Sequence, residues 1–147
     1  MKAWVALLAG LVLSINAPAA DYSNPDEAIK ARQDQFEDIK ASFKQLRFLV
    51  IQKQFDAMAA REEADKLVEL SQPLVAMFRT RSDQGDTKAL DRIWEHWPRF
   101  EKQMNEFVEL TKKTADSLKY ANQEDARMYV NQAAKSCKGC HRLFKAR

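Results

Sequence analysis

The stretch 97-WPRFEKQMNEFVELTKKTADSL-118 decides the fold class of this chain of 147 residues. Its apolar and small side chains recur at steps of three and four residues, which is the pattern of one face of an α-helix. The positions on this face are Trp97, Phe100, Met104, Phe107, Thr111, Thr114 and Leu118. The period of two that marks a β-strand is missing from the sequence, so we predict an all-α protein.

Three other segments show the same helical period. The first begins at the predicted N-cap Asn24, followed by Pro25. Its apolar positions are Phe36, Ile39, Phe43, Leu46 and Val50. The second runs from Phe55 to Phe78, and we expect Pro73 to kink or break it near Gln72. The last carries one stripe of Ala126, Val130, Ala133, Cys137, Cys140 and Phe144.

Short connections join these segments, and residues 82–87 form the clearest loop. Four amphipathic helices with short connections predict an antiparallel four-helix bundle. The formal net charge is +3 and the charges are interspersed, which does not favour a nucleic-acid partner.

Residues 1–19 are typical of a secretory signal peptide, with basic Lys2 and an apolar run from Ala3 to Ile15. Cleavage after Ala19 or Ala20 leaves a single domain over residues 20–147. An uncleaved membrane anchor is the alternative. Export places the chain in an oxidising compartment, and we expect the bacterial periplasm, with no membrane association after cleavage.

The two cysteines, Cys137 and Cys140, belong to a C-x-x-C-H sequence that ends at His141. Residues three and four apart project from the same side of a helix. C-x-x-C-H is the signature of c-type haem: each thiol adds to one vinyl group of the porphyrin, and the imidazole reaches the iron. We therefore predict one covalently attached haem c per chain.

Three other interpretations of the cysteines fit less well. A disulfide or redox C-x-x-C normally opens a helix after a strand, whereas this one lies near the end of the last predicted helix. A zinc site needs a fourth ligand, and His96 is the only other histidine. Two plain buried cysteines would leave both the adjacent histidine and the leader as coincidences.

The mature chain resembles the cytochromes c′, the helical class of c-type cytochromes. The resemblance rests on the leader, Arg32-Gln33 followed by Phe36, Ile93-Trp94-Glu95 at the opening of the third predicted helix, and the terminal Cys137–His141 motif. It implies a four-helix bundle with haem between the helices near one end. The common small-haem class instead has its C-x-x-C-H near the N-terminus and a methionine ligand downstream.

The resemblance also implies that Phe36 lies over the open face of the iron. In this family the distal residue comes from the first helix, four residues after an arginine, which is here Arg32. Some relatives have a ligating methionine at that position, but phenylalanine has no donor atom. We therefore expect five-coordinate iron, with His141 as its single protein ligand.

The methionines are the alternative second ligands, because a thioether can ligate haem iron. Met58, Met77 and Met104 fall in apolar helical patterns, where packing is the ordinary explanation. Met128 lies off the main stripe of the last helix, and His96 is expected at the surface.

Four further contacts follow from the resemblance. Arg32 and Gln33 are expected to bind a haem propionate, since a guanidinium fork suits a carboxylate; an exposed arginine at the end of the bundle is the alternative. Thr87 falls near a position where relatives contact the haem edge. Lys145 matches a basic residue that relatives place beside the proximal imidazole.

Two functions could follow from such a site. An open ferrous iron under an apolar side chain suits nitric oxide and carbon monoxide, and the resemblance points to nitric oxide binding. The alternative is a periplasmic electron carrier that serves a redox partner. The sequence shows no acid–base pair or nucleophile, so we do not expect an enzyme.

Phe48, Leu49 and Ile51 add apolar surface to the first predicted helix outside its core stripe. Many members of the resembled family pair through their first two helices, and an exposed apolar face usually marks a contact. We therefore expect a homodimer. The alternative is that these residues pack beneath the connection between the first two helices.

Overall fold

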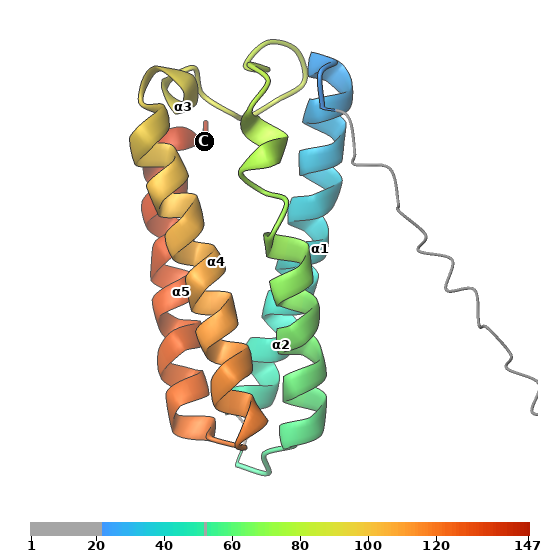
Figure 1. Ribbon diagram of the computed structural model, residues 1–147, viewed down its shortest axis with the longest axis vertical. Coiled ribbons are helices and arrows are strands. Elements are labelled where there is room, and N and C mark those ends of the chain that lie inside the picture. Colours follow the sequence, from blue (N-terminus) through green and yellow to red (C-terminus); the bar gives the residue numbers. More distant parts are fainter. Residues whose placement is uncertain (1–21, 52) are drawn as a thin grey trace, which may run out of the picture.

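A computed structural model describes residues 22–51 and 53–147. The predicted leader and its cleavage site lie outside the described residues. The elements are α1 (Pro25–Ile51), α2 (Ala57–Ser71), the 3₁₀ helix η1 (Ala76–Phe78), α3 (Arg92–Glu95), α4 (Trp97–Lys119) and α5 (Gln123–Phe144). The four long helices α1, α2, α4 and α5 run alternately in opposite directions (Figure 1). The predicted antiparallel four-helix bundle is therefore confirmed.

Local sequence signals explain where the first two helices begin and end. The Asn24 Oδ1 accepts hydrogen bonds from the backbone N–H groups of Asp26 and Glu27, at 2.9 and 3.3 Å, and so caps α1 as expected. The second segment breaks where predicted, because α2 ends at Ser71, two residues before Pro73. The chain resumes as the single turn η1.

The third predicted helix differs from the structure at its start. Residues 93–95 lie in the separate one-turn helix α3, and His96 divides it from α4 with φ −119° and ψ 42°. Pro98 has no N–H to donate to the Trp94 carbonyl, so an uninterrupted helix could not complete its hydrogen bonds here. His96 is exposed, as expected.

The predicted apolar stripes form the core of the bundle. Its largest fully buried apolar side chains are Leu46, Val50, Leu67, Leu74, Ile93, Phe100 and Val130. Met77 and Met104 are also buried, as the packing interpretation predicts. The same interpretation was wrong for Met58, which is 82% exposed. It lies two residues before buried Ala60, and two helical residues turn through about 200° to the opposite face.

The end of α5 is tied to the segment that precedes α3. Ala89 and Lys145 form an isolated antiparallel bridge. The Leu90 N–H donates to the Phe144 carbonyl at 3.1 Å, and the Ala146 N–H donates to the Lys88 carbonyl at 2.8 Å. The C-terminus, α3 and the 82–87 loop therefore share one end of the bundle (Figure 1). Among the described residues, no helix is long and apolar enough to cross a membrane.

Candidate haem site

The thiols of Cys137 and Cys140 lie on the inward side of α5, between buried Ala133 and Phe144. Both thiols are partly buried and pack against the core, and neither forms a disulfide. Burial raises the pKa of the Cys137 thiol. Burial and the neighbouring Cys137 raise the pKa of Cys140 to about 11. Both groups are therefore protonated thiols at neutral pH, which is the form that adds as S–H across a vinyl group.

These raised pKa values favour haem attachment over a redox-active pair. A catalytic C-x-x-C has a thiol pKa lowered below the ordinary value, and the two thiols here are shifted the other way. The zinc alternative gains no support either, since the described residues bring together no group of three or more histidine, cysteine or acidic side chains able to hold a metal ion.

His141 is the residue predicted to be the axial ligand of the iron. It follows Cys140 directly near the end of α5, where the residue as a whole is exposed but its ring is partly shielded from water. Partial burial, and then the positive charge of Lys145, lowers the pKa of the His141 imidazole. The ring is therefore neutral at neutral pH and has a nitrogen lone pair available for iron. Lys145 is exposed, and its predicted place beside the proximal imidazole stays a prediction.

Because α1 and α5 are antiparallel, Phe36, the predicted distal residue, lies at the same level of the bundle as Cys137. At one end of the pair, Gln123 Nε2 donates to the Val50 carbonyl at 3.1 Å. Phe36 lies fourteen residues before Val50, and Cys137 lies fourteen residues after Gln123. Both positions are therefore about 21 Å along the bundle from that contact. Arg32 and His141 share a level one turn further on, by the same count.

Phe36 lies at one end of a series of aromatic contacts at this end of the bundle. The Phe36 ring is partly buried and meets the Phe78 ring edge-on, with 6.3 Å between centroids. The Phe78 ring also contacts the rings of Trp94 and Phe100, with centroid distances of 6.4 and 4.8 Å. The Phe100 ring in turn contacts the ring of Phe144 of α5, with 5.4 Å between centroids. These flat, polarisable side chains suit contact with a porphyrin.

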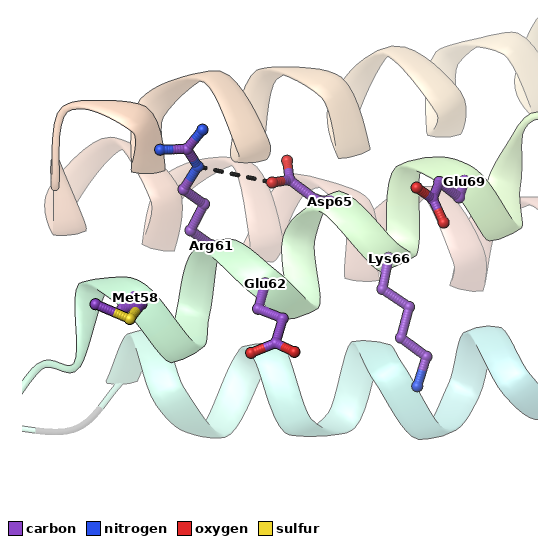
Figure 2. A pocket seen from close by; sticks show the side chains of 6 residues that line it. All are labelled: Met58, Arg61, Glu62, Asp65, Lys66 and Glu69. Atoms are coloured by element: carbon purple, nitrogen blue, oxygen red, sulfur yellow. Dashed lines mark ion pairs between the residues drawn. The ribbon is translucent and has the colours of Figure 1, made fainter. Parts of the chain in front are cut away.

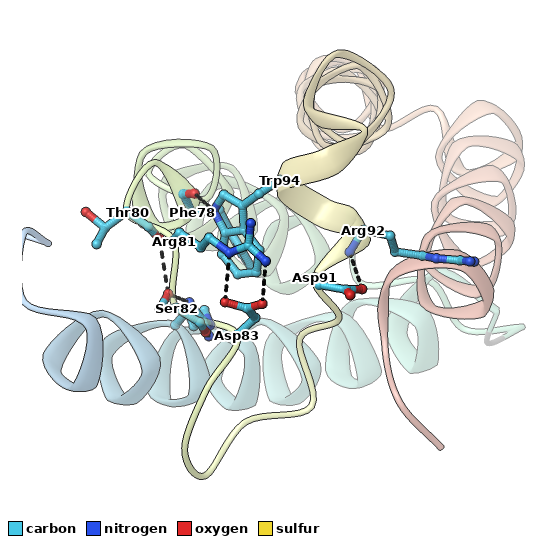
Figure 3. Close-up of polar contacts among 9 residues, drawn as sticks. Phe78, Thr80, Arg81, Ser82, Asp83, Asp91, Arg92 and Trp94 are labelled. Carbon is cyan, nitrogen blue, oxygen red and sulfur yellow. Dashed lines mark hydrogen bonds and ion pairs between the residues drawn. The ribbon is translucent and has the colours of Figure 1, made fainter.

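Sequence reasoning did not assign Phe78 or Trp94 to the site. Trp94 Nε1 donates to the Phe78 carbonyl at 2.8 Å, which ties α3 to η1 (Figure 3). The only signal in the sequence was Trp94 within the Ile93-Trp94-Glu95 sequence. The pairing with Phe78 depends on how the segment between α2 and α4 folds back, and this segment is longer than the short connection predicted.

Arg32 holds the 82–87 loop against α1. Its guanidinium donates to the Ser82 hydroxyl, to the Ser82 carbonyl and, at 3.0 Å, to the Thr87 hydroxyl. Ser82 in turn donates to the Thr80 carbonyl at 3.1 Å (Figure 3). Gln33 Nε2 donates to the Asp86 carbonyl at 2.7 Å. The structure therefore brings Arg32, Gln33 and Thr87 into one cluster.

The Arg32 side chain is only 3% exposed, which excludes the alternative of an arginine exposed at the end of the bundle. Its guanidinium lies over the Phe78 ring, 4.9 Å from the centroid. Its three hydrogen-bond acceptors are neutral, and burial lowers its pKa although the charge of Asp83 opposes this. A buried cation with neutral partners favours an anionic ligand nearby, so the cluster fits a haem propionate.

We expect Arg32→Met to lower the free energy of unfolding by about 2 kcal/mol, because it leaves the Ser82 carbonyl without its side-chain donor and leaves the Thr87 hydroxyl with the Ala89 N–H alone. Lys30→Met is the matched control, since it removes an exposed cation from the same helix and should cost less than about 0.5 kcal/mol. Urea unfolding measures both variants. An equal loss in the two variants would show that Arg32 contributes only its charge.

A separate groove runs along the outer face of α2, away from the cluster of Arg32, Gln33 and Thr87. It is lined by Met58, Arg61, Glu62, Asp65, Lys66 and Glu69 (Figure 2). Charges of both signs line it, and Arg61 pairs with Asp65 at 3.6 Å. No residue predicted for the haem site lies in this groove.

The helical bundle and its terminal thiol–imidazole motif define the class of helical c-type haem proteins. The cytochrome c′ family model matches residues 27–145 of the chain. The chain therefore belongs to the cytochrome c′ family, and it carries covalently attached haem c as members of that family do. No curated protein matches the chain.

Solved structures agree with this assignment. The chain is 32% identical to cytochrome c′ from Shewanella frigidimarina, with a TM-score of 0.79. It is 26% identical to cytochrome c′ from Rubrivivax gelatinosus, with a TM-score of 0.80. A variant of cytochrome c′ from Alcaligenes xylosoxidans, solved as its nitric oxide complex, is 22% identical with a TM-score of 0.77 and is similar in fold. Each comparison covers 86% of this chain and 100% of the other.

Proposed function

We propose that this chain is a periplasmic haem protein that binds nitric oxide and carbon monoxide at a five-coordinate iron. Cys137 and Cys140 hold the haem, His141 is the single protein ligand, and Phe36 covers the opposite face. When bound, the haem supplies one open coordination position for a diatomic gas. The placement of Phe36 at the level of Cys137, on the facing helix, is the observation that carries this proposal.

None of the four methionines in the described residues competes well for the open position. Met77 and Met104 are packed into the core, while Met58 and Met128 are exposed. Phe36 has no atom that can donate to a metal. The side chains around the predicted distal position therefore leave one face of the iron without a protein ligand.

The polar side chains that flank Phe36 on α1 are engaged elsewhere. Arg32 and Gln33 bond to the 82–87 loop, and Gln35 Nε2 donates to the Leu70 carbonyl. Bound O₂ gains from a hydrogen-bond donor beside it, whereas nitric oxide and carbon monoxide depend less on one. The apolar distal side therefore favours these two gases, and the nitric oxide complex of the Alcaligenes xylosoxidans variant supports the same chemistry.

Titration of the ferrous protein with each gas tests this selectivity. We expect saturable spectral changes with nitric oxide and with carbon monoxide, and no stable complex in air. A stable O₂ complex would show that a hydrogen-bond donor faces the iron, against the distal side proposed here.

Electron transfer is the second candidate function. A strongly basic surface lies beside the segment of α5 that carries the cysteines, and such a surface suits docking of an acidic redox partner.

We also propose a homodimer through α1 and α2. Three of the exposed large apolar residues flank the α1–α2 turn: Phe48 is 61% exposed, Ile51 49% and Met58 82%. Met58 lies at one end of the α2 groove (Figure 2). The exposure of Phe48 and Ile51 argues against the alternative that they pack beneath the turn; Leu49 is partly buried.

Phe48→Glu should convert this dimer to a monomer, because the variant places a charge in a contact that buries apolar surface. Tyr120→Glu is the control, since Tyr120 is an exposed aromatic residue at the α4–α5 turn. Sedimentation velocity at micromolar concentration measures both. A wild-type protein that sediments only as a monomer would contradict the dimer.

A further inference from the structure

A basic groove lies between α1 and α5, with a volume of about 320 Å³. Arg47 of α1 lines it together with Asn131, Ala134, Lys135 and Lys138 of α5. The side chains of Arg47, Lys135 and Lys138 are exposed, and no carboxylate lines the groove. Within the described part of the chain, none of these three cations forms an ion pair.

The groove belongs to a strongly basic segment of the sequence. Residues 126–147 contain six cations and no Asp or Glu, so the rest of the chain has a formal net charge of −3. The α2 groove differs, because its cation Lys66 lies between Glu62 and Glu69 (Figure 2). Positive charge is therefore gathered after the acidic first turn of α5, along the rest of this helix and the three residues that follow it.

The position of Lys138 connects this groove to the haem. Lys138 lies between Cys137 and Cys140 in the C-x-x-C-H sequence and also lines the groove. A macromolecule seated on the groove therefore contacts the turn of α5 that bears the proposed thioether bonds. Such a partner brings its own redox centre close to the haem.

We propose that this basic groove is the docking surface for the acidic face of a protein that exchanges electrons with the haem. A small monovalent anion gains little from exposed cations in water. Several carboxylates on one surface engage several cations at once, and their combined field speeds the encounter. The docking role rests on the proposed haem attachment at Cys137 and Cys140, whereas the anion binding itself does not.

The test compares two variants of the haem-loaded protein with the same change in net charge. The groove variant is Arg47→Gln/Lys135→Gln/Lys138→Gln. The control is Lys30→Gln/Lys66→Gln/Lys112→Gln, whose positions lie on α1, α2 and α4 outside the groove. At low ionic strength, an oligoglutamate peptide serves as the binding probe. Anionic hexacyanoferrate(III) serves as the kinetic probe and takes one electron from the ferrous protein, becoming hexacyanoferrate(II).

The groove variant should bind oligoglutamate about tenfold more weakly and react about tenfold more slowly with hexacyanoferrate(III), whereas the control changes less than about twofold. Equal losses in both variants would overturn the proposal, because they would show an effect of net charge alone. Tight binding to phosphatidylserine vesicles without binding to oligoglutamate would also overturn it, in favour of a membrane surface. Carbon monoxide binding should be the same in the wild type, the groove variant and the control variant. A wild type that fails to bind this gas would contradict the proposed function but not the docking surface.

Discussion

Phe36→Met is expected to convert a high-spin, five-coordinate iron into a low-spin, six-coordinate one. The substitution places a thioether, a known axial ligand of haem, at the level of Cys137 on the facing helix. If the thioether closes the site in about 99% of molecules, the apparent affinity for carbon monoxide falls about 100-fold. Absorption spectra and carbon monoxide titration measure both effects.

Two companion variants separate ligation from crowding. Phe36→Leu should remain five-coordinate, since leucine also has no donor atom. Phe36→Ala should bind carbon monoxide faster and more tightly, because no ring has to move aside. Its stability falls by about 3 kcal/mol or less if the ring packs in the core, so rates are compared on folded protein. A high-spin Phe36→Met protein with wild-type carbon monoxide binding means that Phe36 does not lie over the iron.

Cys137→Ala/Cys140→Ala should abolish covalent haem attachment completely. Thioether bonds keep haem on the chain through denaturing electrophoresis and acid–acetone extraction, so the wild type should retain haem-linked peroxidase staining. The double variant should lose it. Each single variant keeps one thiol and serves as the matched control, with some staining retained.

His141→Ala completes the series. It should leave both thioether bonds possible while removing the axial nitrogen, so staining persists but the spectrum changes. Haem that acid–acetone strips from the wild-type protein would contradict the assignment of the two cysteines.

Most of the bundle could be predicted from the sequence because its helices are amphipathic. The steps of three and four residues from Trp97 to Leu118 predict α4 almost residue for residue. Pro73 correctly predicts the end of α2. The separate helix α3 was missed, since the effect of Pro98 falls on the hydrogen bonding of residues several positions earlier. Met58 was misassigned because an apolar residue in the first turn of a helix does not by itself reveal which face it occupies.

The site was predictable only in part, because some of its contacts join residues that are far apart in the sequence. Cys137, Cys140 and His141 are adjacent in sequence, so their motif carries their chemistry directly. The partners of Arg32 lie about fifty residues away, at Ser82 and Thr87. The aromatic contact of Phe36 with Phe78 likewise needs the folded chain. The basic groove joins Arg47 of α1 to α5, so no single stretch of sequence contains it.

The absorption spectrum of the purified protein tests the central claim most directly. It is recorded oxidised and reduced, at neutral pH, with and without carbon monoxide. An iron held only by His141 under Phe36 should give high-spin bands in both oxidation states, and the reduced spectrum should shift when carbon monoxide is added. A low-spin spectrum that carbon monoxide leaves unchanged would contradict the account, because it would require a second protein ligand on the face assigned to Phe36.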